Sequence, residues 1–146
     1  FRSDMIRPLL KGADIKKWDV TNYDEIIIFP YHIKHDKAFL IEEENLKAKY
    51  PKTYDYLLQT KSKLESREHG KWKGVSNWYA FGRKSNIEQF DQDKILIQVL
   101  ANSATFALDK GVNVLFVGGG TAGGYGIALS TESIISSDCL IALLNS

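Results

Sequence analysis

Residues 69–93 show neither the period of an amphipathic helix nor the alternation of a β-strand, and they separate a helical segment from a β-rich one. Loops of that length are uncommon in a compact domain and are often either functional or disordered. The aromatic side chains in this loop, among them Trp72, Trp78 and Tyr79, argue against disorder. We therefore expect an ordered loop of the kind that carries function.

The segment before this loop combines a helix with short strands. Pro51 suits the first position of a helix that runs to about Arg67. The residues that recur at helical spacing on its core-facing side are Tyr54, Leu57, Leu58 and Leu64. The β-branched run 25–30 predicts a buried strand that Pro30 ends, and residues 37–41 predict a second, short strand.

Strand patterns dominate the segment after the loop. Residues 94–100 predict one strand, and residues 125–129 predict another. Residues 104–108 and 112–117 predict a hairpin, and its turn contains Gly111, which tolerates positive φ.

These elements predict an α+β fold, with a curved, mostly antiparallel sheet, one main helix and a truncated C-terminal helix in the apolar stretch 134–144. A length of 146 residues suits one domain with an ordinary core, and no linker composition divides it. We therefore expect residues 1–146 to form a single domain. The first residue is Phe1, which suggests a fragment of a longer polypeptide.

The composition excludes several classes of protein. The longest apolar runs, residues 26–29 and 139–144, are too short to cross a bilayer, and no leader pattern follows Phe1. The single cysteine, Cys139, excludes an internal disulfide and a multi-cysteine zinc site. We expect a cytoplasmic protein with no membrane partner.

The net charge of +1 hides an asymmetry along the chain. Residues 1–84 hold 17 Lys and Arg against 12 Asp and Glu, whereas residues 85–146 hold 2 against 6. Between Lys61 and Lys84 seven basic residues accompany two acidic ones. A local basic surface attracts polyanions even when the whole domain is near neutral, although a solvated helix face is an equally ordinary explanation.

The basic residues around the loop are interleaved with aromatics, which is typical of nucleic-acid recognition. Arg83 and Lys84 are the best candidates for groove or phosphate contacts, because a bidentate Arg–guanine pair provides about 1–3 kcal/mol of discrimination. Further candidates in this region are Arg67, Lys71, Trp72, Lys73, Trp78 and Tyr79. Trp72, Trp78 and Tyr79 would stack or wedge against the nucleic acid, and the alternative is that Trp78 and Tyr79 anchor the loop in the core.

Three lysines near the N-terminus form a second candidate group. Lys11, Lys16 and Lys17 would contact a phosphate backbone, and plain solvent exposure is the alternative. Gln98 could bond an adenine edge, but a strand glutamine more often faces outward without a role.

A series of short motifs resembles the TaqI-like C-terminal specificity domain, the target recognition domain of adenine-N6 DNA methyltransferases. In chain order these motifs are Arg7-Pro8-Leu9-Leu10-Lys11-Gly12-Ala13-Asp14-Ile15-Lys16, Tyr50–Leu57, Trp78-Tyr79, Phe90–Ile97, Ser103–Asp109, Tyr125-Gly126-Ile127 and Ala142–Ser146. They occur in the family's order and cover nearly the whole chain.

The resemblance implies a DNA-binding role within a restriction-modification system. Such domains recognise double-stranded DNA for a methyltransferase domain that lies upstream in the same chain, binds S-adenosylmethionine and carries an Asn-Pro-Pro-Tyr/Phe motif. Some family members are fused to an endonuclease. The catalytic motif is absent from residues 1–146, so we expect no catalytic residue and no cofactor in this fragment. The parent protein would flip the target adenine out of the duplex.

The glycine-rich stretch 118–123 satisfies G-x-G-x-x-G after an apolar run, which is the pattern of a dinucleotide site. Three features disfavour that site. Too few residues follow Gly123 for a βαβ unit, residues 112–117 pair best in a hairpin, and residues 125–129 are a poor helix start. Nucleotide binding at this stretch remains a lesser alternative.

Other signals are weaker. His32, His35 and Asp36 could suggest a metal site, but histidines beside a strand end are more often exposed loop residues. The rival from another functional class is a protein-interaction module that uses the same aromatic and basic loop.

Overall fold

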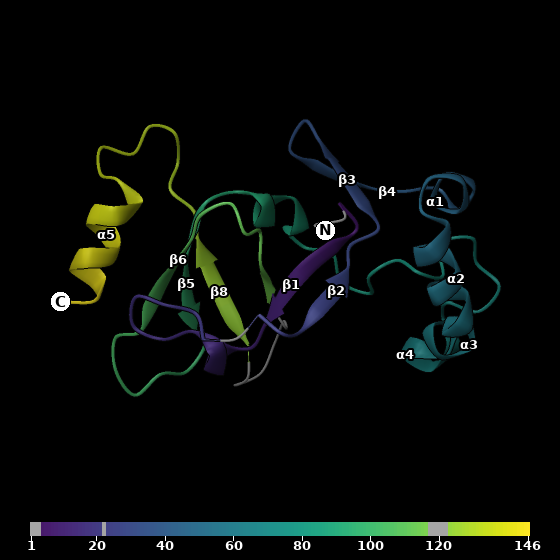
Figure 1. Ribbon diagram of the computed structural model, residues 1–146, viewed down its shortest axis with the longest axis horizontal. Coiled ribbons are helices and arrows are strands. Elements are labelled where there is room, and N and C mark those ends of the chain that lie inside the picture. The colour runs from purple at the N-terminus through teal and green to yellow at the C-terminus, as the bar shows by residue number, and fades with distance from the viewer. Residues whose placement is uncertain (1–3, 22, 117–122) are drawn as a thin grey trace. The chain divides into compact units, whose positions relative to one another are not determined.

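The computed structural model describes residues 4–21, 23–116 and 123–146 (Figure 1). The chain divides into two compact units. We call the first the helical unit, which contains Met5 and Ile28–Glu88, and the second the sheet unit, which contains Ile6–Ile27 and Gln89–Ser146.

The helical unit begins with a β-hairpin. Strands β3 (Tyr31–Lys34) and β4 (Lys37–Leu40) pair in antiparallel register. The two residues of the turn, His35 and Asp36, have φ of 49° and 54°, as a type I′ turn requires. Strand β4 confirms the predicted strand at 37–41, whereas β3 was not predicted, because His-Asp lacks the Asn-Gly signal of such turns.

Four short helices follow the hairpin: α1 (Glu43–Lys49), α2 (Pro51–Gln59), α3 (Lys61–Glu65) and α4 (Arg67–Gly70). Pro51 begins α2 as predicted, but the predicted continuous helix to Arg67 is broken at Thr60. The Thr60 hydroxyl donates to the Leu57 carbonyl at 3.1 Å and closes the first segment. Leu58 was wrongly placed in the core, since it is 41% exposed. Adjacent residues lie about 100° apart around a helix, and here Leu57, at 6% exposure, takes the core-facing position while Leu58 lies to its side.

The core of the helical unit joins the helices to the loop that follows them. Its buried members are Met5, Ile41, Leu46, Leu57, Trp78 and Tyr79. Ile28, Leu40, Tyr50, Tyr54 and Leu64 pack against it. The 69–93 segment contains little regular structure after α4, as predicted, apart from the 3-10 turn Ile87–Asp91.

The sheet unit is built around β5 (Lys94–Gln98), which lies between β6 (Phe106–Asp109) and β8 (Gly124–Ile127). Both pairings are antiparallel. These strands confirm the predictions at 94–100 and 125–129. The buried cluster beneath them is formed by Leu10, Ile15, Val20, Leu96, Ala107 and Val114.

A second three-stranded sheet has the order β2-β1-β7. It consists of β2 (Ile26–Ile28), β1 (Ile6–Leu10), which precedes the 3-10 turn Gly12–Asp14, and β7 (Leu115–Phe116). The β1–β7 pairing is parallel, with Leu9 opposite Leu115. The predicted buried strand at 25–30 is a short edge strand, and Ile26 is 61% exposed because β2 has a neighbour on one side only.

The predicted hairpin over 104–117 is wrong. Strand β6 pairs with β5 and β7 pairs with β1, so the two strands lie in different sheets. The Asp109 carboxylate explains the change of direction, because it accepts hydrogen bonds from the backbone N–H groups of Val112 at 3.1 Å and Val114 at 3.0 Å. Gly111 does take positive φ, at 69°, as predicted. The α+β class and the predominance of antiparallel pairing are confirmed, but the strands form three small sheets instead of one curved sheet.

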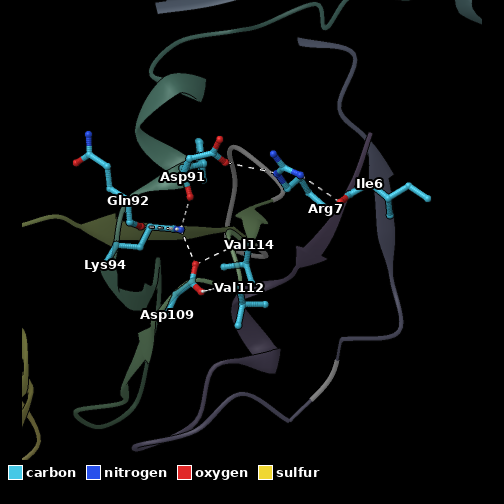
Figure 2. A network of polar contacts seen from close by, with 9 residues as sticks. Ile6, Arg7, Asp91, Gln92, Lys94, Asp109, Val112 and Val114 are labelled. Atoms are coloured by element: carbon cyan, nitrogen blue, oxygen red, sulfur yellow. Dashed lines mark hydrogen bonds and ion pairs between the residues drawn. The ribbon is translucent and has the colours of Figure 1, made fainter. Parts of the chain in front are cut away.

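A buried ion pair joins the start of β5 to the end of β6, next to this turn (Figure 2). The Lys94 ammonium lies 2.5 Å from the Asp109 carboxylate and also donates to the Phe90 carbonyl at 2.7 Å. Both side chains are buried, at 3% and 1% exposure. Nearby, Arg7 and Asp91 form a further ion pair at 3.4 Å.

The predicted C-terminal helix is α5 (Ser137–Leu144), with Ser136 as its N-cap and the preceding Ile134 fully exposed. The buried Asn145 side chain docks its end onto β6, since it both donates to the Phe106 carbonyl at 2.9 Å and accepts from the Phe106 N–H at 3.1 Å. Among the described residues, none of the helices has the length and apolarity that crossing a bilayer requires.

Candidate nucleic-acid interface

The predicted contact residues are distributed over both units. Lys11, Lys16 and Lys17 belong to the sheet unit. The remaining candidates belong to the helical unit, and they are Arg67, Lys71, Trp72, Lys73, Trp78, Tyr79, Arg83 and Lys84.

Arg67 directs its guanidinium into the helical unit. Its Nε donates to the Leu64 carbonyl at 2.8 Å. One terminal nitrogen donates to the carbonyls of Trp78 at 2.9 Å and Ala80 at 3.1 Å. Arg67 therefore fastens the end of α3 to the loop at 78–80, and these bonds engage three of the five N–H donors of its guanidinium.

Trp72 lies under two cations. The Arg67 guanidinium is 5.2 Å from the centre of its ring, and the Lys71 ammonium is 5.6 Å away. Lys71 also pairs with Glu68 at 3.3 Å, whereas Lys73 is exposed. Cation–π contacts of this kind hold the half-buried Trp72 on the protein.

Trp78 and Tyr79 lie in the core, at 1% and 5% exposure. Their rings meet edge to face with 5.3 Å between centres. The Tyr79 hydroxyl donates to the Ile41 carbonyl at 2.5 Å. Burial, with a smaller contribution from Glu43, raises the pKa of Tyr79 to about 12. The buried positions of Trp78 and Tyr79 favour the alternative in which they anchor the loop. Stacking on DNA would require ring faces that the core covers.

Arg83 and Lys84 are exposed on the loop that leaves this core. Directly before them, the Phe81 N–H donates to the Tyr31 hydroxyl at 2.7 Å. The Phe81 ring packs against Tyr31 at 5.1 Å and Phe29 at 6.0 Å between ring centres. The loop thus starts from a fixed aromatic cluster, and within the described part of the chain neither cation has a carboxylate within ion-pair distance.

Gly82, one residue before Arg83, lies close to the end of α4. A Cβ at this position would meet the Glu68 carboxylate, which is the end of a flexible, exposed side chain and can move aside.

The lysines of the sheet unit differ among themselves. Lys11 is exposed and its ammonium bonds the Glu25 carboxylate, and this bond raises the pKa of Lys11. Lys16 and Lys17 are exposed in a turn beside Trp18, which has a φ of 73° and is 53% exposed. Lys16 and Lys17 are therefore more open to a ligand than Lys11, and the sequence reasoning missed the exposed Trp18 next to them.

Gln98 makes a bond within its own unit. Its side-chain amide donates to the Ile15 carbonyl at 2.6 Å, and the residue is half-buried. The glutamine thus joins β5 to the turn after β1 instead of facing outward or presenting its amide to a base.

The glycine-rich stretch lies largely outside the described residues, which resume at Gly123. As the sequence indicated, the element that follows is a strand, β8, and not a helix. One argument against a dinucleotide site was wrong, because β7 pairs in parallel with β1 and not in a hairpin with β6. A dinucleotide site nevertheless needs a helix N-terminus after its glycines, and strand β8 follows them here instead.

His32 lies on β3, while His35 and Asp36 form the hairpin turn. Within the ranges that the structure describes, no group of three or more His, Cys, Asp or Glu side chains could hold a metal ion.

No family model matches this sequence. The chain is similar to part of a restriction-modification enzyme. It is 28% identical over 108 residues to the type II restriction enzyme and methyltransferase RM.Eco57I of Escherichia coli, and this match covers 71% of the chain. The chain spans 11% of the length of that enzyme.

Proposed function

We propose that this chain is the sequence-specific DNA recognition part of an adenine-N6 DNA methyltransferase or of a fused restriction-modification enzyme. Two similarities of the sequence support the proposal. The sequence motifs resemble the TaqI-like specificity domain, and the chain is similar to a segment of a relative whose name includes both restriction and methyltransferase activity.

The observation that carries the proposal is the exposed pair Arg83 and Lys84 on a loop with a fixed base. The loop is held at Phe81 by Tyr31 and, just upstream, at Trp78 and Ala80 by Arg67. A base-reading side chain must be held in position to discriminate, because loosely held groups lose binding energy when they become ordered.

The two cations have different roles in this proposal. Arg83 has the forked donor geometry that matches the O6 and N7 atoms of guanine in the major groove. Lys84 would contact phosphate as a point charge and help to set the register of the protein on the duplex. Lys16, Lys17 and Lys73, which are also exposed, would add sequence-independent phosphate contacts.

The chemistry would belong to another part of the parent protein. In this proposal an upstream methyltransferase domain of the same polypeptide binds S-adenosylmethionine and methylates an adenine that has been flipped out of the duplex. The chain described here would recognise the target sequence in the DNA. It would act in the cytoplasm, where the DNA substrate is found. The coding sequence upstream of Phe1 tests this arrangement, because it should contain an Asn-Pro-Pro-Tyr or Asn-Pro-Pro-Phe motif.

Binding of the 146-residue chain to fluorescent duplex DNA tests the recognition role directly. Each phosphate contact contributes a slope of about −0.9 to the plot of log affinity against log salt. The double variant Arg83→Ala/Lys84→Ala should bind more weakly and with a shallower slope than the wild type. The matched control is Lys47→Ala/Lys49→Ala, which removes two exposed cations from α1 of the same unit.

Two results would count against the proposal. The first is equal binding by the loop variant and the control variant. The second is affinity that does not change with salt, which would favour the rival protein-interaction module, because a hydrophobic protein interface involves little counterion release.

A further inference from the structure

We propose that the exposed face of the β3–β4 hairpin is a second DNA contact, a two-stranded ribbon that enters the major groove. This inference rests on the proposed function, because it assumes that the chain holds duplex DNA near the Arg83 loop. No sequence pattern had indicated this surface, which the pairing register of the hairpin creates.

The register gathers four side chains on one face of the hairpin. His32 lies opposite Phe39, and Lys34 lies opposite Lys37. Because opposite residues and residues two apart in a strand point to the same side of a sheet, all four share a face. All four are exposed, and Phe39 is 52% exposed. The residues of the other face are buried or half-buried, and they are Tyr31, Ile33, Ala38 and Leu40.

Within the described ranges of the chain, the positive charge on this face has no acidic partner. Lys34 and Lys37 are directly opposed, and like charges in that position disfavour strand pairing. The one acidic residue between 31 and 40 is Asp36, in the turn. Among the residues that the structure describes, no carboxylate lies within ion-pair distance of either lysine. A polyanion would supply the missing opposite charge, which an uncharged or cationic partner would not.

The dimensions of the hairpin suit the major groove. Strands of four residues are about 13 Å long, and two paired strands lie about 5 Å apart. The major groove is about 12 Å wide and admits a two-stranded ribbon. Lysine side chains can bond guanine acceptors there, and an exposed phenylalanine can pack on a thymine methyl group. Figure 1 shows the tip of the hairpin clear of the helices α1–α4 of its own unit.

The hairpin and the Arg83 loop start from the same aromatic cluster. Tyr31 begins β3, and its hydroxyl accepts the hydrogen bond from the Phe81 N–H. Phe29, just before the hairpin, packs against both Tyr31 and Phe81. The two basic segments are therefore fixed to each other without any help from a ligand, and a duplex could contact both with little ordering cost.

The test compares two double variants of the 146-residue chain. Lys34→Ala/Lys37→Ala removes the hairpin cations, and Lys47→Ala/Lys49→Ala is the control with the same change in charge on α1. Circular dichroism first establishes that both variants are folded. Affinity for a pool of random 30-base-pair duplexes is then measured from low to physiological salt.

We assume that each lysine contacts one phosphate and that the affinities of the variant and the wild type converge at about 1 M salt. The salt slope of the hairpin variant should then be shallower by about 1.8, and its affinity at 0.1 M salt should be about 60-fold lower. We expect the control to stay close to the wild type. Phe39→Ala should weaken binding without a change in slope. Dimethyl sulfate, which methylates guanine N7 in the major groove, should reach guanines that the wild type protects once the hairpin lysines are removed.

The outcomes separate this inference from the proposed function. If Arg83→Ala/Lys84→Ala weakens duplex binding but the hairpin variant matches the α1 control, the hairpin inference alone is overturned. Equal affinity of the wild type for single strands and duplexes, with no protection of N7, also overturns it. If the wild type shows no salt-dependent binding to duplex DNA, both proposals fail together.

Discussion

Replacement of Arg67 distinguishes a residue that holds the loop from one that touches DNA. Its guanidinium donates to three carbonyls, those of Leu64, Trp78 and Ala80, at 2.8–3.1 Å, and it stacks on Trp72. The variant Arg67→Ala leaves all three carbonyls without this donor. Arg67→Lys keeps the charge but lacks the planar fork that reaches several acceptors at once.

The cost of each variant follows from the hydrogen bonds and the ring stacking that it removes. A net contribution of about 1 kcal/mol for each hydrogen bond gives about 3 kcal/mol for the three bonds. The stacking on Trp72 adds about 0.5–1 kcal/mol. We therefore expect Arg67→Ala to lower the free energy of unfolding by about 3.5–4 kcal/mol, a large part of the roughly 5–15 kcal/mol of a typical domain. Arg67→Lys should cost about 2 kcal/mol, since an ammonium can replace about one of the three bonds.

Urea unfolding measures the stability, and amide hydrogen exchange reports on the loop. In the Arg67→Ala variant we expect faster exchange in the 78–84 segment, together with weaker DNA binding at an unchanged salt slope. A phosphate contact would behave in the opposite way, with a slope shallower by about 0.9 and an unaltered urea midpoint. That second pattern would refute the assignment of Arg67 as the residue that fastens the loop.

Two further predictions concern the cores of the two units. Asp109→Ala should cost about 3–5 kcal/mol in urea unfolding, because it leaves the buried Lys94 ammonium unpaired, whereas Lys110→Ala, which breaks an exposed pair with Asp138, should cost less than about 1 kcal/mol. Similar losses in both variants would contradict this view of the buried pair. The second prediction uses the pKa of Tyr79, which burial raises to about 12, so that the unfolded chain ionises first, at about pH 10. The stabilisation of the folded state by neutral Tyr79 is complete below pH 10 and is lost as the pH rises toward 12. The difference in unfolding free energy between wild type and Tyr79→Phe should therefore shrink by about 1 kcal/mol between pH 9 and pH 11, and a difference that stays constant would show that the pKa of Tyr79 is not raised.

Several elements could be predicted because their causes are local. Pro51 begins a helix, since its fixed φ suits the first helical position, and Gly111 takes positive φ in its turn. Strand β5 was also predicted, because a run of apolar β-branched residues favours a central strand. The failures have non-local causes. The 104–117 hairpin is replaced by pairings with β5 and β1, and the Asp109 carboxylate that turns the chain is itself buried with Lys94, 15 residues earlier.

For the candidate site, too, the sequence predicted features with local causes and missed features with non-local ones. Sequence reasoning selected the basic and aromatic segment and placed Arg83 ahead of Arg67. It gave no sign that the Arg67 guanidinium would bond the carbonyls of Leu64, Trp78 and Ala80. It also missed the face of the hairpin, because a two-residue His-Asp turn gives no local signal for the register that aligns Lys34 with Lys37.

By itself, the amino-acid sequence determined where a helix starts, which runs can form strands and where positive charge is concentrated. The tertiary structure decided which of those groups remain free to act. Arg67 is occupied by carbonyls that lie 11 and 13 residues away in sequence, while Arg83 remains exposed. The physical reason is that hydrogen bonding and burial depend on distances in space, and a chain acquires these distances only when it folds.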